Sequence, residues 1–92
     1  MPRPKLRRCI QFMPGVVFFK PQGIPLRLLE EILLEHDELE ALKLYEVDGF
    51  NQIKASEKMK ISQPTFARII GSAHKKIANA IVLGKAIRIQ TS

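Results

Sequence analysis

The clearest pattern of hydrophobic and polar positions lies within residues 52–83 and predicts two helices joined by a short turn. Ala55, Ser56 and Met59 recur at helical spacing and mark the inner face of the first helix. Ile61 supplies one apolar side chain to the turn. This layout is that of a helix-turn-helix, whose second helix enters the major groove of DNA. A helical hairpin in a small all-α domain has the same pattern, so charge must separate the two interpretations.

Ser62 marks the start of the second helix, because its hydroxyl group can accept a hydrogen bond from a free N–H group of the first turn. Pro64 fits that turn, where a missing N–H group does no harm. An apolar stripe follows at spacings of three and four: Phe66, Ile69, Ile70, Ala73, Ile77, Ala80 and Ile81. Gly84 is a suitable C-cap, so we predict a long recognition helix over residues 62–83.

Charge is segregated along the chain. Residues 1–29 carry six basic groups and no acidic group, and residues 30–48 carry eight acidic groups with Lys43 alone. From residue 49 onward, eight basic groups stand against Glu57 alone. The basic part coincides with the predicted helix-turn-helix, and DNA is a polyanion. Charge therefore favours DNA binding, and a solvated basic surface is the alternative.

Composition limits the class of protein. The 92 residues suffice for one domain, and an apolar fraction of 46% is ordinary for a globular protein. Cys9 is the single cysteine and no Cys/His cluster has metal-ligand spacing, so we expect no internal disulfide bond, no metal and no cofactor. No apolar run approaches the ~20 residues that span a bilayer, and no signal peptide opens the chain. We therefore expect a cytoplasmic protein without membrane contact.

The N-terminal third has no helical pattern. Residues 1–8 form a basic arm that either lies in a minor groove of DNA or serves as a solubilising tail. Prolines and glycines are dense in residues 9–33, which predicts an extended strap with short strands at Cys9–Phe12 and Val16–Phe19.

Two further elements flank the central pattern. The segment Glu35–Glu46 predicts a helix that begins between residues 35 and 37, with Asp37 and Glu40 as a loose capping box. Its acidic groups should face away from nucleic acid, and its apolar residues cover a wide, buried arc: Ala41, Leu42, Leu44 and Tyr45. Residues 85–90 alternate in polarity and predict a short strand beside Cys9–Phe12.

Taken together, the motifs resemble the uncharacterised prokaryotic proteins grouped as family 0251, also described as domain of unknown function 134. The resemblance covers nearly the whole chain. It rests on the opening Pro-Arg-Pro, on Phe19, Pro21, Gly23 and Pro25, on Asp37-Glu38-x-Glu40-Ala41-Leu42, on Met59-x-Ile61-Ser62-x-x-Thr65-Phe66-x-Arg68-Ile69, on Ala73-x-x-Lys76-Ile77-Ala78-x-Ala80 and on Gly84-Lys85-Ala86-Ile87-x-Ile89.

The resemblance implies a mainly α fold: a small helix-turn-helix domain over residues 34–92, with an extended N-terminal strap and a short C-terminal strand. Residues 34–82 are similar to region four of bacterial sigma factors, which reads promoter DNA, although a shared fold does not establish a shared role. Three positions depart from the pattern. Ser56 stands where such motifs usually have Ala, Lys60 where they have Gly, and Gly71 where family members have a longer residue.

We therefore expect a sequence-specific transcriptional regulator that binds double-stranded DNA as a homodimer. Candidate base contacts lie in the exposed first turns of the recognition helix: Gln63, Thr65 and Arg68. Candidate phosphate contacts are basic or hydroxyl side chains of the arm and the helices: Arg3, Lys5, Arg7, Arg8, Lys58, Lys60, Ser62, Ser72, Lys75 and Lys76.

The alternative is a protein-interaction module that docks on transcription machinery, with residues 30–48 as a second docking surface. An enzyme is not expected, because His36 and His74 lie on different predicted helices and no nucleophile is matched to either.

We predict that deletion of residues 1–7 weakens DNA binding but leaves the melting temperature nearly unchanged, because it removes basic groups and no core residue. A salt titration of affinity measures this, since each lost phosphate contact lowers the slope of log K against log salt by about 0.9. If the shortened chain unfolds, the arm is structural and the minor-groove interpretation fails.

Overall fold

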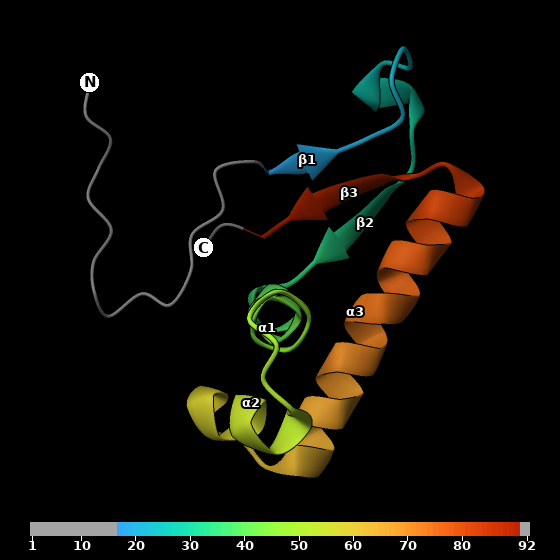
Figure 1. The fold of residues 1–92 in the computed structure, drawn as a ribbon. Coiled ribbons are helices and arrows are strands. Elements are labelled where there is room, and N and C mark those ends of the chain that lie inside the picture. The colour runs from blue at the N-terminus through green and yellow to red at the C-terminus, as the bar shows by residue number, and fades with distance from the viewer. Residues whose placement is uncertain (1–16, 91–92) are drawn as a thin grey trace, which may run out of the picture.

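A computed structural model describes residues 17–90, which are mostly helical and carry a 3-stranded sheet (Figure 1). The elements in chain order are β1 (Phe18–Phe19), β2 (Glu31–Leu34), α1 (His36–Leu42), α2 (Gln52–Met59), α3 (Gln63–Leu83) and β3 (Ala86–Ile89). A 3-10 turn, Leu26–Leu28, lies between β1 and β2, and α1 continues as a π-helical segment, Lys43–Val47. The predicted small, mainly α domain is confirmed. No helix within residues 17–90 is long and apolar enough to cross a membrane.

The sheet joins segments from both ends of the described chain. Its order is β1-β3-β2, so β3 lies in the centre. β1 pairs with β3 in antiparallel fashion, with Phe18 opposite Arg88, and β2 pairs with β3 in parallel fashion, with Leu34 opposite Ile89. All three helices therefore lie on the connection between β2 and β3, because a parallel pair requires a crossover.

The sheet corrects part of the sequence interpretation. β2 lies across the end of the segment that was predicted to be an extended strap, and no strand was predicted there. Strand β3 was predicted, but within residues 17–90 its partners are β1 and β2. The predicted strand Cys9–Phe12 and the basic arm lie outside the described residues.

Helix α3 runs along the whole molecule, with α1 and α2 beside its first part and the sheet beside its last part (Figure 1). The core between the helices consists of buried residues from all three helical segments: Ala41, Leu44, Ala55, Phe66 and Ile70. Phe66 is fully buried, and its ring meets Tyr45 edge-on at a centroid distance of 6.2 Å. The predicted inner faces of both helices are thereby confirmed.

One residue of the predicted apolar stripe is exposed. Ala80 is 2% exposed, but the neighbouring Ile81 is 72% exposed. The C-terminal part of α3 lies beyond the helical core and packs only on the sheet, so a narrower face of the helix is covered there. Gly84 ends α3 in a left-handed conformation with φ 69°, as the C-cap prediction required.

A buried carboxylate ties α1 to α3. The Glu38 side chain is 8% exposed and accepts hydrogen bonds from Lys76 Nζ at 2.8 Å and from Ser72 Oγ at 2.5 Å. Lys76 Nζ also donates to the Leu33 carbonyl oxygen at 2.8 Å. One ammonium group therefore holds α1, α3 and the end of β2 together.

The same carboxylate completes the N-terminal capping box of α1. Glu38 Oε1 accepts from the Glu35 N–H group at 2.9 Å, so the box consists of Glu35 and Glu38. The predicted pair, Asp37 and Glu40, was wrong by two positions. Glu38 is buried in the contact between α1 and α3, a role that the sequence analysis did not predict. Lys76, the cation that neutralises Glu38, lies on another helix 38 residues further along the chain, so the local pattern does not reveal this pair.

Two glutamates of α1 have opposite pKa shifts. Burial acts to raise the pKa of Glu38, but the hydrogen bonds from Lys76, Ser72 and the Glu35 backbone outweigh it, and the pKa lies below its ordinary value. Burial raises the pKa of Glu40, only partly offset by the charge of Lys43. Ionised Glu38 therefore stabilises the fold, and ionised Glu40 opposes it.

We predict that Glu38→Ala lowers the free energy of unfolding at pH 7 by about 2 kcal/mol, because Lys76 and Ser72 lose their buried acceptor. Glu38→Gln should cost less. A group with a lowered pKa stabilises the fold above its ordinary pKa and loses that effect as pH falls through the folded-state value. The difference between wild type and Glu38→Gln should therefore shrink in denaturant melts below about pH 4.5.

Glu40→Gln is the matched control with the opposite sign. Because the pKa of Glu40 is raised, this change should be neutral or stabilising at pH 7. Equal losses of stability in Glu38→Gln and Glu40→Gln would contradict a special role of the Glu38 carboxylate.

Candidate nucleic-acid interface

The turn between α2 and α3 contains a residue in the left-handed conformation, at the position where such motifs usually have glycine. Lys60 has φ 60° and ψ 43°, and it is the single non-glycine residue with positive φ within residues 17–90. The Lys60 N–H group bonds to the Glu57 carbonyl oxygen at 3.0 Å, and the Ile61 N–H group bonds to the Ser56 carbonyl oxygen at 3.1 Å. The left-handed residue closes α2 and directs the exposed Lys60 side chain away from the core.

The start of α3 is capped as predicted. Ser62 Oγ accepts from the Thr65 N–H group at 3.2 Å, and its hydroxyl group donates to Thr65 Oγ1 at 2.9 Å. Both side chains are thereby held by each other. Thr65 is half-buried, so of the three candidate base contacts it is the least free to turn toward a ligand. Asn51 caps α2 in the same way, by accepting from the Lys54 N–H group at 2.8 Å.

The outer face of α3 carries exposed polar and basic side chains. Gln63 lies in the first turn, and Arg68 and Lys75 follow on the side opposite the buried Phe66. Arg68 and Lys75 are seven residues apart, which places them on one face about 10 Å apart along the axis. Helix α3 contains no acidic residue.

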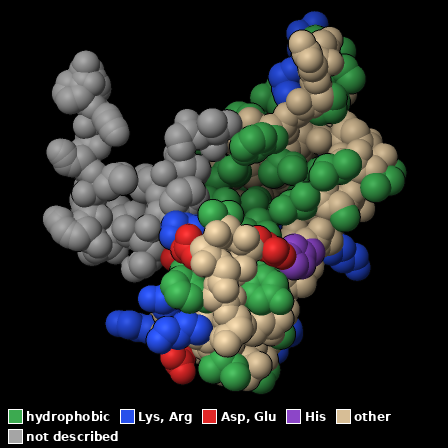
Figure 2. Space-filling model, viewed as in Figure 1, with side chains coloured by type: hydrophobic (Ala, Val, Ile, Leu, Met, Phe, Trp, Pro, Cys, Tyr) green, Lys and Arg blue, Asp and Glu red, His purple; other side chains and the backbone are tan. Residues whose placement is uncertain are grey.

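Lysines of α2 and the turn add to this charge. Figure 2 shows basic side chains gathered over α2, in the lower part of the view. Lys58 Nζ lies 4.8 Å from the centroid of the Phe50 ring, a cation–π contact that holds the side chain in place. Lys54 is 4.0 Å from Glu57, and both side chains are more than half exposed, so that pair neutralises little.

Within residues 17–90, several acidic groups of residues 30–48 have a basic partner close by. Lys43 Nζ lies 2.7 Å from Asp48 Oδ2, and His74 Nε2 lies 2.6 Å from Glu46 Oε2. By contrast, Lys60, Arg68 and Lys75 form no salt bridge in this part of the chain. Three cations without a salt bridge therefore lie on α3 and the turn before it.

Not every predicted site residue lies on this surface. Ser72 and Lys76 both bond to Glu38 and belong to the contact between α1 and α3. We therefore leave them out of the candidate interface. The arm residues Arg3, Lys5, Arg7 and Arg8 lie outside the described residues.

Two features of the surface were missed by sequence reasoning. Phe50 orients Lys58, and Lys54 adds a cation at the start of α2. The charge run from residue 49 onward contained a signal for Lys54, but the aromatic contact depends on how the turn after α1 folds back. The other residues of this surface could be predicted from the helix caps and the helical period.

Comparisons with known proteins agree with the family resemblance. A family model described as "Protein of unknown function DUF134" matches residues 1–92. A UPF0251 protein of Moorella thermoacetica is 49% identical over 90 residues, which are 98% of this chain and 60% of that protein. A UPF0251 protein of Caldanaerobacter subterraneus subsp. tengcongensis is 51% identical over 98% of this chain and 76% of its own length.

A third relative, from Prosthecochloris aestuarii, is 50% identical over 96% of this chain and 57% of its own length. The chain thus spans between about half and three quarters of the length of these relatives. No solved structure matches the chain.

We predict that Lys60→Gly stabilises the fold by about 1 kcal/mol, because glycine adopts the left-handed conformation without the steric cost of a Cβ atom. Lys60→Ala is the matched control: it removes the same charge but keeps the Cβ atom, so it should not stabilise. Urea melts of the three proteins compare the free energies. A clear destabilisation by Lys60→Gly would contradict the left-handed turn.

Proposed function

We propose that this chain, which belongs to the DUF134 family, binds double-stranded DNA through a helix-turn-helix formed by α2 and α3 and acts as a sequence-specific transcriptional regulator. The observation that carries the proposal is the charge on α3. Its solvent face bears Arg68 and Lys75 without an acidic partner, while its other faces pack on the core. A helix of this kind fits the major groove, whose walls are phosphate-lined.

The position of each side chain suggests its role. Gln63 and Arg68 lie in the first two turns of α3, where a recognition helix approaches base edges, and an arginine side chain can bond both acceptors of guanine. Lys75 lies two turns further along, where the helix leaves the groove and passes the backbone. Lys58 and Lys60 flank the start of α3 and suit the phosphates on the other side.

The hydrogen bonds at the start of α3 bear on how this end of the helix would bind DNA. Because Ser62 and Thr65 bond each other, the free N–H groups of the first turn are already partly satisfied by the protein. Affinity at this end then depends on side chains rather than on the helix terminus. The Thr65 hydroxyl group accepts from Ser62 but keeps its own O–H donor, so it can still donate to an acceptor on a base edge.

We predict that Arg68→Ala and Lys75→Ala have different effects on DNA binding. Loss of a bidentate guanine contact should cost about 1–3 kcal/mol on the selected site and little on scrambled DNA. Loss of a phosphate contact should weaken both DNAs alike and reduce the salt slope by about 0.9. Selection from a random DNA pool supplies the site, and fluorescence anisotropy at several salt concentrations measures both affinities.

Arg27→Ala is the control, because Arg27 is an exposed arginine in the turn between β1 and β2, remote from α2. It should change neither affinity beyond the effect of one distant charge. If Arg68→Ala weakens both DNAs equally, Arg68 contacts phosphate and base readout lies elsewhere. Absence of any DNA binding at low salt would favour docking on a protein partner instead.

A further inference from the structure

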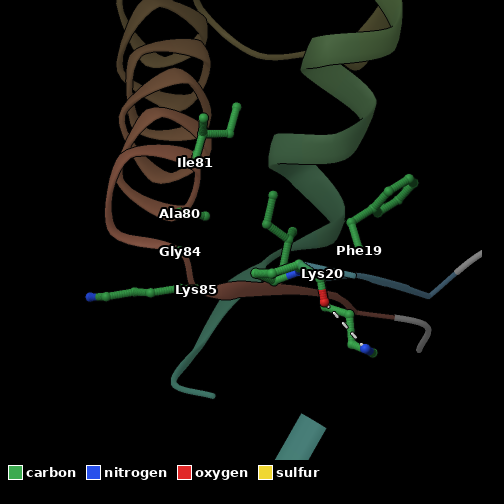
Figure 3. Close-up of a pocket in the computed structure, with 8 residues that line it drawn as sticks. Phe19, Lys20, Ala80, Ile81, Gly84 and Lys85 are labelled. Atoms are coloured by element: carbon green, nitrogen blue, oxygen red, sulfur yellow. Dashed lines mark hydrogen bonds between the residues drawn. The ribbon is translucent and has the colours of Figure 1, made fainter. Parts of the chain in front are cut away.

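A second surface lies at the opposite end of α3 from the proposed DNA contact. There, a hollow of about 270 Å³ separates β1 from the last turns of the helix. Ala80 and Ile87 line it, and Phe19 and Ile81 stand at its sides with exposed fractions of 54% and 72%. Figure 2 shows hydrophobic side chains gathered over this part of the molecule, and Figure 3 shows Ile81 and Phe19 on opposite sides of the hollow.

The two lysines that line the hollow direct their charges out of it. Lys20 Nζ donates to the carbonyl oxygens of Ile24 at 2.8 Å and Pro21 at 3.3 Å. Lys85 Nζ lies 3.2 Å from Glu30 Oε1, and its side chain extends away from Phe19 (Figure 3). The hollow is thus apolar at its centre, and its rim holds both signs of charge. Such a surface does not attract an anion, but it suits an apolar partner.

We propose that this surface binds a second copy of the chain. A two-fold interface uses the same patch on both subunits, so the patch must supply both the protruding group and the space that receives it. This patch does so, because Ile81 and Phe19 protrude beside a hollow of side-chain size. The two-fold partner's side chains fill the hollow, and this subunit's side chains fill the partner's hollow.

Charge along α3 determines which part of the helix can meet its copy. Residues 77–83 carry no charge, whereas Arg68, Lys75 and Lys76 all lie in the preceding part. Two copies can therefore approach through their C-terminal turns without repulsion, while contact through the N-terminal turns would oppose like charges. The mixed rim, in which Lys85 pairs with Glu30, is likewise compatible with a copy of itself.

The same arrangement sets the distance between two DNA contacts, and this step rests on the proposed function. Thr65 and Ile81 are sixteen residues apart, or about 24 Å along a straight helix. For two α3 helices that meet near Ile81, an angle of roughly 90° between them is the one that would match the separation of successive major grooves on one side of DNA, about 34 Å.

Sedimentation velocity of the full chain without DNA tests the interface over a concentration series. Wild type should form a dimer, and Ile81→Glu should raise its dissociation constant at least about tenfold, because a carboxylate would have to lose water against apolar side chains. Phe19→Glu should act in the same way from the other side of the hollow. Because both residues are exposed, circular dichroism melts should remain close to wild type.

Val47→Glu is the matched control, since Val47 is 79% exposed and lies outside the hollow. It should leave the dimer intact. The proposal would be overturned if wild type stayed monomeric at a concentration of about 100 μM. It would also be overturned if Ile81→Glu and Phe19→Glu left the dimer unchanged. A monomer that dimerises only after residues 1–16 are deleted would overturn it as well, because the hollow's occupant would then be that segment. None of these readouts depends on DNA binding.

Discussion

The orientation of α3 depends on one buried carboxylate. Glu38 receives Lys76 and Ser72 from α3 while it caps α1, and this contact fixes which side of α3 faces inward. With Lys76 turned to α1, the helical phase leaves Arg68 and Lys75 on the solvent side. A buried ion pair adds little net stability compared with an apolar contact, because desolvation opposes it. We expect its effect to be specificity for one rotation of the helix, which the burial of Phe66 and Ile70 also favours.

The two halves of α3 differ in what they pack against and in which side chains they expose. The first half packs Phe66 and Ile70 into the helical core and exposes cations, and the second half packs Ala80 against the sheet and exposes Ile81. The sheet makes the second half possible, because β3 follows α3 directly through Gly84 and returns alongside it. A domain with α1, α2 and a shorter α3 would have the same basic surface but no apolar hollow at its far end.

The fold was predictable where the determining contacts are local. Ser62 and Gly84 each act through hydrogen bonds within a few residues, and both were placed correctly. The contacts that failed are distant in sequence. β2 finds its partner β3 across three helices, and the polarity of Glu30 and Glu31 concealed it because its edge is solvent-exposed. The buried contact of Glu38 was not predicted, since its partner Lys76 lies 38 residues away.

The candidate site was predictable to the same extent. Helical phase identified the outward positions of Arg68 and Lys75, because a regular helix has a fixed period. It also placed Ser72 outward, and there it was wrong, because the deciding factor was an acceptor on another helix. Phase gives the direction of a side chain, but hydrogen-bond partners decide whether that side chain is available to a ligand.

Gly71 shows how the structure narrows an open question about α3. An exposed glycine within a helix costs about 0.5–1 kcal/mol relative to alanine, so a packing reason would be expected. None exists within residues 17–90, since, apart from the adjacent residues and the backbone of its own helix, nothing lies within 4 Å of a Cβ atom placed at position 71. What remains is the solvent side, where Gly71 lies between Arg68 and Lys75 on the same stretch of helix. A helix surface without a side chain at that point would let a phosphate group approach the backbone between two cations. The proposed DNA contact would therefore explain a glycine at position 71, which the protein's own packing does not explain.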